Sequence, residues 1–160
     1  MPYIVPPVPT GVDADAWSAA VAKVRSHCRW HIAPSVTETV TVDGSGAPII
    51  VLPTLRLTDL ISITNDGTAV TSPEWSTSGM VYRGTCASWS PKFRSVVAEM
   101  THGFDTWPED LEAVTVELAA ATSLAGVKQI SSGSHQVSFE TSMNAHVLET
   151  LERYKLPFLQ

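Results

Sequence analysis

The sequence is poor in charged side chains. Of its 160 residues, 16% are Asp, Glu, Lys or Arg, whereas globular proteins usually have about 25%. Hydrophobic residues make up 44%, which excludes intrinsic disorder, because disordered chains combine high charge with few apolar residues. Ser, Thr and Val must therefore cover much of the surface, which suits a β-rich protein or one that hides surface in an assembly.

Clusters of basic residues are absent. The chain has 10 Lys and Arg against 16 Asp and Glu, a formal net charge of −6, and no two basic residues are adjacent. Proteins that grip DNA or RNA bind the phosphates through clustered cations, so we expect no tight nucleic-acid binding. An acidic protein is still compatible with DNA that slides past without being held.

Cysteines and long apolar runs are also scarce. Cys28 and Cys86 are the only thiols and form no CxxC motif, so reduced thiols are expected rather than a disulfide framework. No run approaches 18 apolar residues, and residues 1–10 are Pro-rich without the basic and apolar regions of a secretory signal. We expect neither a membrane span nor secretion.

Motifs for catalysis or phosphate binding are missing as well. The chain has no G-x-S-x-G motif, and Gly44 and Gly46 are not followed by the helix and lysine of a phosphate loop. His27 and His31 have the spacing of one helix face, and with His102 they define an alternative, a zinc-dependent enzyme. A polar helix end is the simpler interpretation, so we predict no enzyme, no catalytic residue, no metal site and no cofactor.

The pattern of apolar residues predicts three helices around a β-module. Trp17, Val21 and Val24 recur at helical spacing, and Thr106 with Glu109 has the spacing of a capping box. At this length one domain is expected. The predicted order is a Pro-rich arm (1–12), a helix (13–33), a β-module (36–100), a helix (106–126), a strand (135–140), a helix (142–155) and a tail (156–160).

Within residues 36–100 the pattern predicts five or six short strands. Apolar and polar residues alternate from Val36 to Val42, although Glu38 falls on the apolar phase. We interpret residues 43–46 as a hairpin turn, residues 65–67 (Asn-Asp-Gly) as the strongest hairpin turn of the chain, and residues 93–100 as the last strand. The expected fold class is α+β, a bundle of about three helices with an antiparallel β-module inserted between the first and second main helices.

Three segments are informative in combination. The first helix closes on Cys28-Arg29-Trp30-His31-Ile32-Ala33-Pro34, Thr101-His102-Gly103-Phe104-Asp105 leads through Pro108-Glu109-Asp110-Leu111 into a helix, and Arg153-Tyr154-Lys155-Leu156-Pro157 comes near the end. In this order the chain, over about residues 13–157, resembles the head-to-tail connector (adaptor or head-completion) proteins of tailed bacteriophages, especially those that infect actinobacteria.

The resemblance implies a structural protein of the virion neck that assembles in the host cytoplasm. Its subunits are expected to form a ring, a dodecamer, under the capsid portal. The portal protein and a stopper or tail-completion protein are the implied partners. Genomic DNA passes through without sequence-specific binding, and no membrane is involved. A stopper is the alternative assignment, but the helix–β–helix order favours the adaptor, because stoppers are more purely β.

The resemblance and the composition together suggest three sets of contact residues. The expected portal interface is Arg153, Tyr154, Leu156, Pro157, Phe158 and Leu159; the alternative is that this tail folds back on its own bundle. The candidates for facing the DNA channel are Glu109, Asp110, Glu112 and Glu117, whose carboxylates repel phosphates. Trp75 and Trp89 are candidates for contact with a neighbouring subunit or the stopper, or alternatively for stacking on a glycan.

Overall fold

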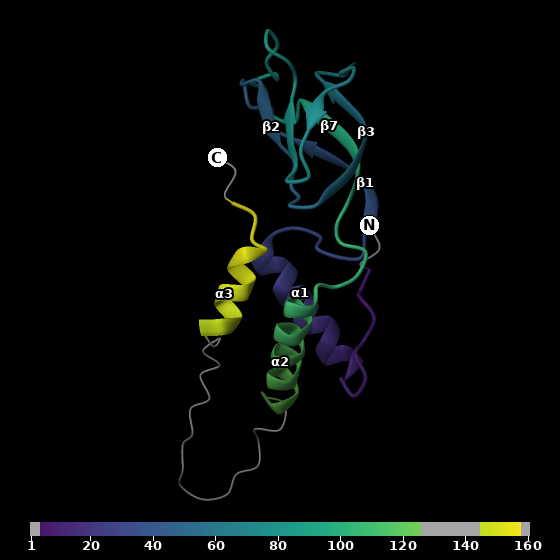
Figure 1. Cartoon of the computed structure of the whole chain (residues 1–160), viewed down its shortest axis with the longest axis vertical. Coiled ribbons are helices and arrows are strands. Elements are labelled where there is room, and N and C mark those ends of the chain that lie inside the picture. Colours follow the sequence, from purple (N-terminus) through teal and green to yellow (C-terminus); the bar gives the residue numbers. More distant parts are fainter. Residues whose placement is uncertain (1–3, 126–144, 158–160) are drawn as a thin grey trace, which may run out of the picture. The chain divides into compact units, whose positions relative to one another are not determined.

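The computed structural model describes residues 4–125 and 145–157. The chain divides into two compact units, and each is described by itself (Figure 1). The first, the helical unit, comprises Met1–Arg29 and Trp107–Lys155, and the second, the β unit, comprises Trp30–Thr106 and Leu156–Gln160. The antiparallel strands lie between the first and second helices in the chain, so the predicted α+β class is confirmed. That the two units fold as one domain stays a prediction.

The first helix, α1, spans Ala14–Cys28. It begins one residue after the predicted start, because Asp13 is the N-cap and its side chain accepts a hydrogen bond from the Ala16 N–H at 2.9 Å. It ends five residues earlier than the predicted 13–33. Arg29 adopts a left-handed conformation (φ 68°) and its N–H bonds back to the Arg25 carbonyl at 2.7 Å, which closes the helix before Pro34 can do so.

The second and third helices are also shorter than predicted. α2 spans Glu109–Ala125; it begins after Pro108, whose carbonyl accepts the Glu112 N–H at 2.8 Å, and not at Thr106. α3 spans Ala145–Arg153 and ends in a turn, in which the Tyr154 N–H bonds to the Leu151 carbonyl at 3.1 Å. Residues 126 and 142–144, predicted to be helical, and the predicted strand 135–140 lie outside the described residues.

The three helices pack against one another. The apolar stripe predicted from Trp17, Val21 and Val24 is confirmed, since these side chains are buried, as are Ala20 and Cys28 on the same helix. Ala16 and Ala20 form a cluster with Ala119 of α2, and these small side chains let the two helices approach closely. The Pro-rich arm is tied to this unit, because the Trp17 indole donates to the Pro6 carbonyl at 3.1 Å.

The β unit holds two antiparallel sheets. The first has the order β1-β7-β3-β4 and the second the order β2-β6-β5. Their bounds are β1 Val36–Val42, β2 Ile49–Val51, β3 Leu57–Asn65, β4 Thr68–Ala69, β5 Glu74–Trp75, β6 Met80–Tyr82 and β7 Val96–His102. β5 was not predicted. β7 begins at Val96 and not at residue 93, because Arg94 has a positive φ of 53° that breaks the extended backbone.

Two turns test the predicted strand pairing. The hairpin at residues 65–67 is confirmed, since β3 and β4 pair across Asp66 and Gly67, both with positive φ. The hairpin at residues 43–46 is wrong. β1 pairs with β7, whereas β2 pairs with β6, so this segment passes from one sheet to the other. The strand partners here are set by pairing between residues far apart in the sequence, which the local turn residues do not predict.

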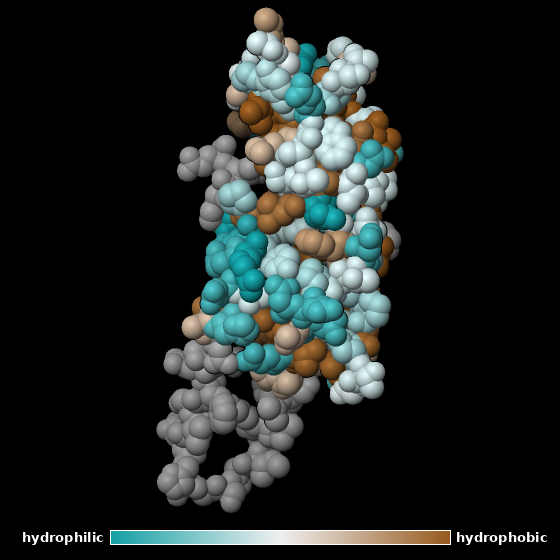
Figure 2. All heavy atoms as spheres, in the orientation of Figure 1, coloured by the Kyte–Doolittle hydropathy of each residue, from teal (hydrophilic) through white to brown (hydrophobic). Residues whose placement is uncertain are grey.

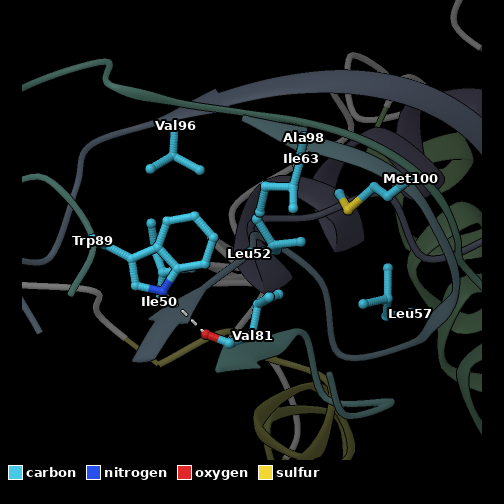
Figure 3. Close-up of a cluster of buried hydrophobic side chains, with 9 residues drawn as sticks. All are labelled: Ile50, Leu52, Leu57, Ile63, Val81, Trp89, Val96, Ala98 and Met100. Atoms are coloured by element: carbon cyan, nitrogen blue, oxygen red, sulfur yellow. Dashed lines mark hydrogen bonds between the residues drawn. The ribbon is translucent and has the colours of Figure 1, made fainter. Parts of the chain in front are cut away.

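One apolar core is shared by the two sheets. Figure 3 shows its side chains converging from both sheets and the connecting loops. Its members are Ile50, Leu52, Leu57, Ile63, Val81, Trp89, Val96, Ala98 and Met100. Trp89 lies among them, and its indole donates to the Val81 carbonyl at 3.3 Å. β7 alternates strictly, with Val96, Ala98 and Met100 turned into this core, and Val81 is the buried residue of β6.

Candidate interaction surfaces

The histidines of the zinc-enzyme alternative do not form a metal site in the described residues. His31 and His102 lie in the β unit with ring centroids 6.1 Å apart, and His27 belongs to the helical unit. The Nε2 atom of His31 contacts the Pro34 carbonyl at 2.6 Å, and Nε2 of His102 contacts Glu38 at 2.8 Å. Both rings thus already serve local structure.

The end of α3 is fastened to α1 by polar contacts. Glu152 Oε1 lies 3.2 Å from His27 Nε2 and 2.5 Å from Lys155 Nζ. The Lys155 hydrogen bond, with a smaller effect of His27, lowers the pKa of Glu152. Beside them the Cys28 thiol donates to the Leu151 carbonyl at 3.7 Å. Burial is the main cause that raises the pKa of Cys28 to about 12, so this thiol stays protonated at neutral pH.

Asp110 fastens the same end of α3 to α2. The Tyr154 hydroxyl donates to Asp110 Oδ1 at 2.8 Å, and an Arg153 guanidinium nitrogen lies 3.7 Å from Oδ2. Burial, followed by the Asp110 hydrogen bond, raises the pKa of Tyr154 to about 12. Arg153 and Tyr154, which the sequence assigned to the portal interface, therefore make contacts within the helical unit.

The remaining residues of the expected portal interface differ in their exposure to solvent. Leu156 is buried, with 6% of its surface exposed, and Pro157 is exposed. Phe158 and Leu159 lie outside the described residues. Of the residues expected to contact the portal from the tail, Pro157 is the described one that is accessible.

The acidic residues of α2 point in different directions. Glu109 and Glu112 line a shallow hollow on the outward face of the helix, together with Ala113 and Val116. Their spacing of three and four residues places them on one side of the helix. Asp110 is turned toward α3, as described above, and Glu117 is exposed next to this face. The sequence predicted four channel-facing carboxylates, and the structure groups two of them with an apolar strip.

The two tryptophans of the β unit have different environments. Trp75 is 39% exposed, whereas Trp89 is 1% exposed in the core (Figure 3). The prediction that Trp89 offers its ring to a neighbour or a glycan is therefore wrong for this fold, because the ring fills the space between the sheets. Trp89 lies between Ser88 and Ser90 in the sequence, so its local sequence does not indicate a core position.

Trp75 lines a hollow on the small sheet, which we call the outer hollow. Its lining residues are Ile49, Glu74, Trp75, Ser76, Met80 and Tyr82. Val81 of β6 is buried, and its neighbours Met80 and Tyr82 face the other way. Ile49 and Glu74 are the direct cross-strand partners of Tyr82. Figure 2 shows apolar side chains, in brown, at the surface of the β unit. Of these residues, only Trp75 is a contact candidate from the sequence. Met80, Val81 and Tyr82 are all apolar or aromatic, so the sequence does not show which of them face outward.

No protein-family model matches the sequence, and no curated protein matches it either. Solved structures do resemble the chain. It matches a chain of the neck of a native gene transfer agent particle, computed with C12 symmetry, at 16% identity and a TM-score of 0.61, over 93% of this chain and 86% of the other. A neck of the empty particle, computed with C6 symmetry, matches at 16% identity and a TM-score of 0.56, over 91% and 78%.

A third structure, the virion of the native gene transfer agent particle, matches at 15% identity and a TM-score of 0.54, over 91% of this chain and 77% of the other. At these identities the likeness establishes a shared fold. In the described part of the chain, no helix combines the length and apolarity needed to cross a membrane.

Proposed function

We propose that this chain is a structural neck protein of a tailed-phage-like particle, acting as the adaptor between the capsid portal and the stopper or tail-completion protein. The observation that carries the proposal is the fold match to a gene transfer agent neck over 93% of the chain. In this role the protein acts by binding and has no catalytic step. An actinobacterial host and assembly in its cytoplasm are part of the proposal.

The proposed assembly is a closed ring of twelve copies. The two matched neck structures were computed with C12 and C6 symmetry, and a twelvefold ring satisfies both, because it also contains the sixfold axis. Closed cyclic symmetry repeats one contact around the ring. A weak contact between two copies therefore becomes a stable assembly when every copy makes it twice.

The outward face of α2 is proposed to line the DNA channel. Glu109 and Glu112 present carboxylates there, and the chain has a net charge of −6. These groups repel phosphates within about 8–10 Å, the Debye length near physiological salt, so DNA slides without sticking. Asp110 is removed from the channel-facing set, because it is bound by Tyr154 and Arg153.

The tail is proposed to contact the portal through Pro157, Phe158 and Leu159. Arg153 and Tyr154 support the tail indirectly, because their contacts with Asp110 hold the end of α3 against α2. An aliphatic and aromatic segment is the kind of anchor that fits a partner's groove.

The test is to mix the purified protein with portal rings of the same particle and to image the product by negative stain. The proposal predicts an added ring coaxial with the portal. Bare portals, under conditions in which complete heads assemble, would overturn the adaptor role and move the protein to the stopper position.

Two deletions test the tail. Removing residues 157–160 keeps the buried Leu156, so the protein should fold as before, with an unchanged urea unfolding midpoint, and should add no ring to portals. Removing 156–160 should also lower the unfolding midpoint. If the 157–160 deletion still adds rings normally, the tail is not the anchor.

A further inference from the structure

The outer hollow has the size and lining to accept an aromatic ring. Its volume is about 260 Å³, and its walls are mainly Ile49, Trp75, Met80 and Tyr82. A cavity of about 150 Å³ with apolar walls is enough to bind benzene. Ile49 and Met80 are each 47% exposed, so the described residues leave this apolar surface open to water.

Phe93 is the most exposed large apolar side chain of the described residues, with 86% of its surface exposed. It is not among the residues that line the outer hollow. Lys92 and Arg94 flank it and are also exposed. Burial of a phenyl ring is favourable, and this ring is left in water. The ring is thus available to a partner.

The loop that presents Phe93 is braced on both sides. The Lys92 carbonyl accepts the Gly44 N–H and the Ser95 hydroxyl, each at 2.9 Å. The Arg94 N–H donates to Asp43 Oδ1 at 2.7 Å, which holds Arg94 at its positive φ of 53°. Such backbone strain persists only where the surroundings enforce it. The backbone at Phe93 is therefore held in place before binding, which reduces the backbone entropy lost on association.

The charges of the two surfaces are complementary. Glu74 lies at the outer hollow, and Arg94 lies beside Phe93. Among the described residues neither of them makes an ion pair, whereas Lys92 is paired with Asp66 at 3.4 Å.

We propose that Phe93 of one copy inserts into the outer hollow of the next copy, with Arg94 paired to that copy's Glu74. The inference rests on the proposed ring and specifies the contact that closes it. The inserted ring and the hollow are different surfaces of one unit, so the contact is heterologous. A heterologous contact closes into a ring when its rotation divides a full turn, as the proposed twelvefold ring requires.

Photo-cross-linking tests the contact directly. Phe93 is replaced by p-benzoylphenylalanine, which keeps an aromatic ring at an exposed position. This variant is prepared in ¹⁵N-labelled and unlabelled form, so that cross-links between copies can be distinguished from those within one copy. An equal mixture of the two forms is assembled into rings on the portal and irradiated. The expected product is a cross-link between copies, joining position 93 to residues within 74–82 or to Ile49. Cross-links in rings to another surface, or none, overturn the inference while the adaptor role stands.

If the wild type adds no ring to portals, the adaptor role fails, and the same irradiation is made on the concentrated protein alone. A cross-link from position 93 to the hollow of another copy then still supports the contact. Its absence there overturns the contact too.

Substitutions provide an independent measurement with a matched control. Phe93→Ser should weaken ring formation on portals at least about tenfold, as expected for the loss of an aromatic anchor. Ile61→Ser removes an apolar side chain that is 50% exposed and lies outside the hollow, and should leave ring formation within about twofold of the wild type. Equal ring formation by both variants contradicts the proposal.

Charge reversal tests the proposed ion pair. Arg94→Glu and Glu74→Arg should each weaken assembly about two- to fivefold, the range of an exposed pair, and the double variant should recover most of the loss. All three variants are first shown to be folded by circular dichroism. If the double variant then assembles no better than the single variants, Arg94 does not pair with Glu74.

Discussion

At the scale of single residues, the protonation of the Cys28 thiol affects the stability of the helical unit. Its thiol is buried and donates to the Leu151 carbonyl. Burial desolvates a thiolate at this position, and the negative charge of the nearby Glu152 disfavours it further. The pKa of Cys28 is therefore raised from 9.0 to about 12. The protonated thiol is thus favoured by the folded state.

We therefore predict a loss of stability in alkali that depends on Cys28. A group whose pKa is higher in the folded state contributes stability that is complete below its unfolded pKa and is lost as the pH rises through the folded value. For Cys28 this window runs from about pH 9 to about pH 12. Urea unfolding measured across it should show a steeper fall for the wild type than for Cys28→Ala. Parallel curves would contradict the prediction.

Tyr154 gives a second prediction. Tyr154→Phe removes the hydrogen bond to Asp110 and should lower the free energy of unfolding by about 1 kcal/mol. Tyr82→Phe is the matched control, because its hydroxyl makes an exposed bond to Thr85 at 3.3 Å, and it should cost less than about 0.5 kcal/mol. Equal losses in urea unfolding would show that Tyr154 does not hold α3 to α2.

Glu38 is an example of a residue whose position is conspicuous in the sequence but whose partner is not. It interrupts the apolar phase of β1, a break that is visible in the sequence. The structure explains it, since Glu38 Oε1 lies 2.8 Å from Nε2 of His102, which is 1% exposed. The partner is on β7, 64 residues away, so the break could be seen but its cause could not. A buried imidazole needs such a partner.

At the scale of elements, two glycines with similar backbone angles differ in their surroundings. Gly67 has φ +76° and Gly79 has φ +81°. An added Cβ at Gly67 meets nothing within 4 Å, whereas at Gly79 it lies 2.7 Å from the Thr54 carbonyl oxygen and 3.0 Å from that of Leu52. The first position is restricted by its φ alone and the second by its φ and a backbone clash.

Gly67→Ala should lower the free energy of unfolding by about 1 kcal/mol, the cost of a left-handed L-residue. Gly79→Ala should lower it by at least about 2 kcal/mol, because the turn at Gly79 must also move away from the Leu52 and Thr54 carbonyls. Urea unfolding of the two variants measures the difference. A smaller loss for Gly79→Ala than for Gly67→Ala would refute this account of the small sheet.

Elements were predictable where their pattern is local. The stripe of α1 and the Asn-Asp-Gly hairpin follow from spacing and turn chemistry, and both are confirmed. The sheet change at residues 43–46 and the burial of Trp89 depend on contacts distant in sequence. The outer hollow has the same origin, because its walls come from three strands that the sequence does not place side by side.

At the scale of the whole molecule, the acidic face of α2 makes a prediction about DNA. Replacing Glu109 and Glu112 by Lys reverses the charge of the proposed channel wall in every copy. Particles built with this variant should release their genome more slowly and with a stronger dependence on salt, because basic side chains bind phosphates. Asp15→Lys with Asp59→Lys makes the same change of charge elsewhere and is the control. Equal release from both variants would place α2 away from the DNA.

The most direct test of the account is the number of copies on one portal. Portal rings incubated with an excess of the protein are purified and weighed by native mass spectrometry. We predict one species that carries twelve copies of this chain, as expected from the C12 symmetry of the matched neck. Portals that carry no copies, or a broad distribution without a closed ring, would contradict the central claim that this protein forms the ring joining the portal to the rest of the neck.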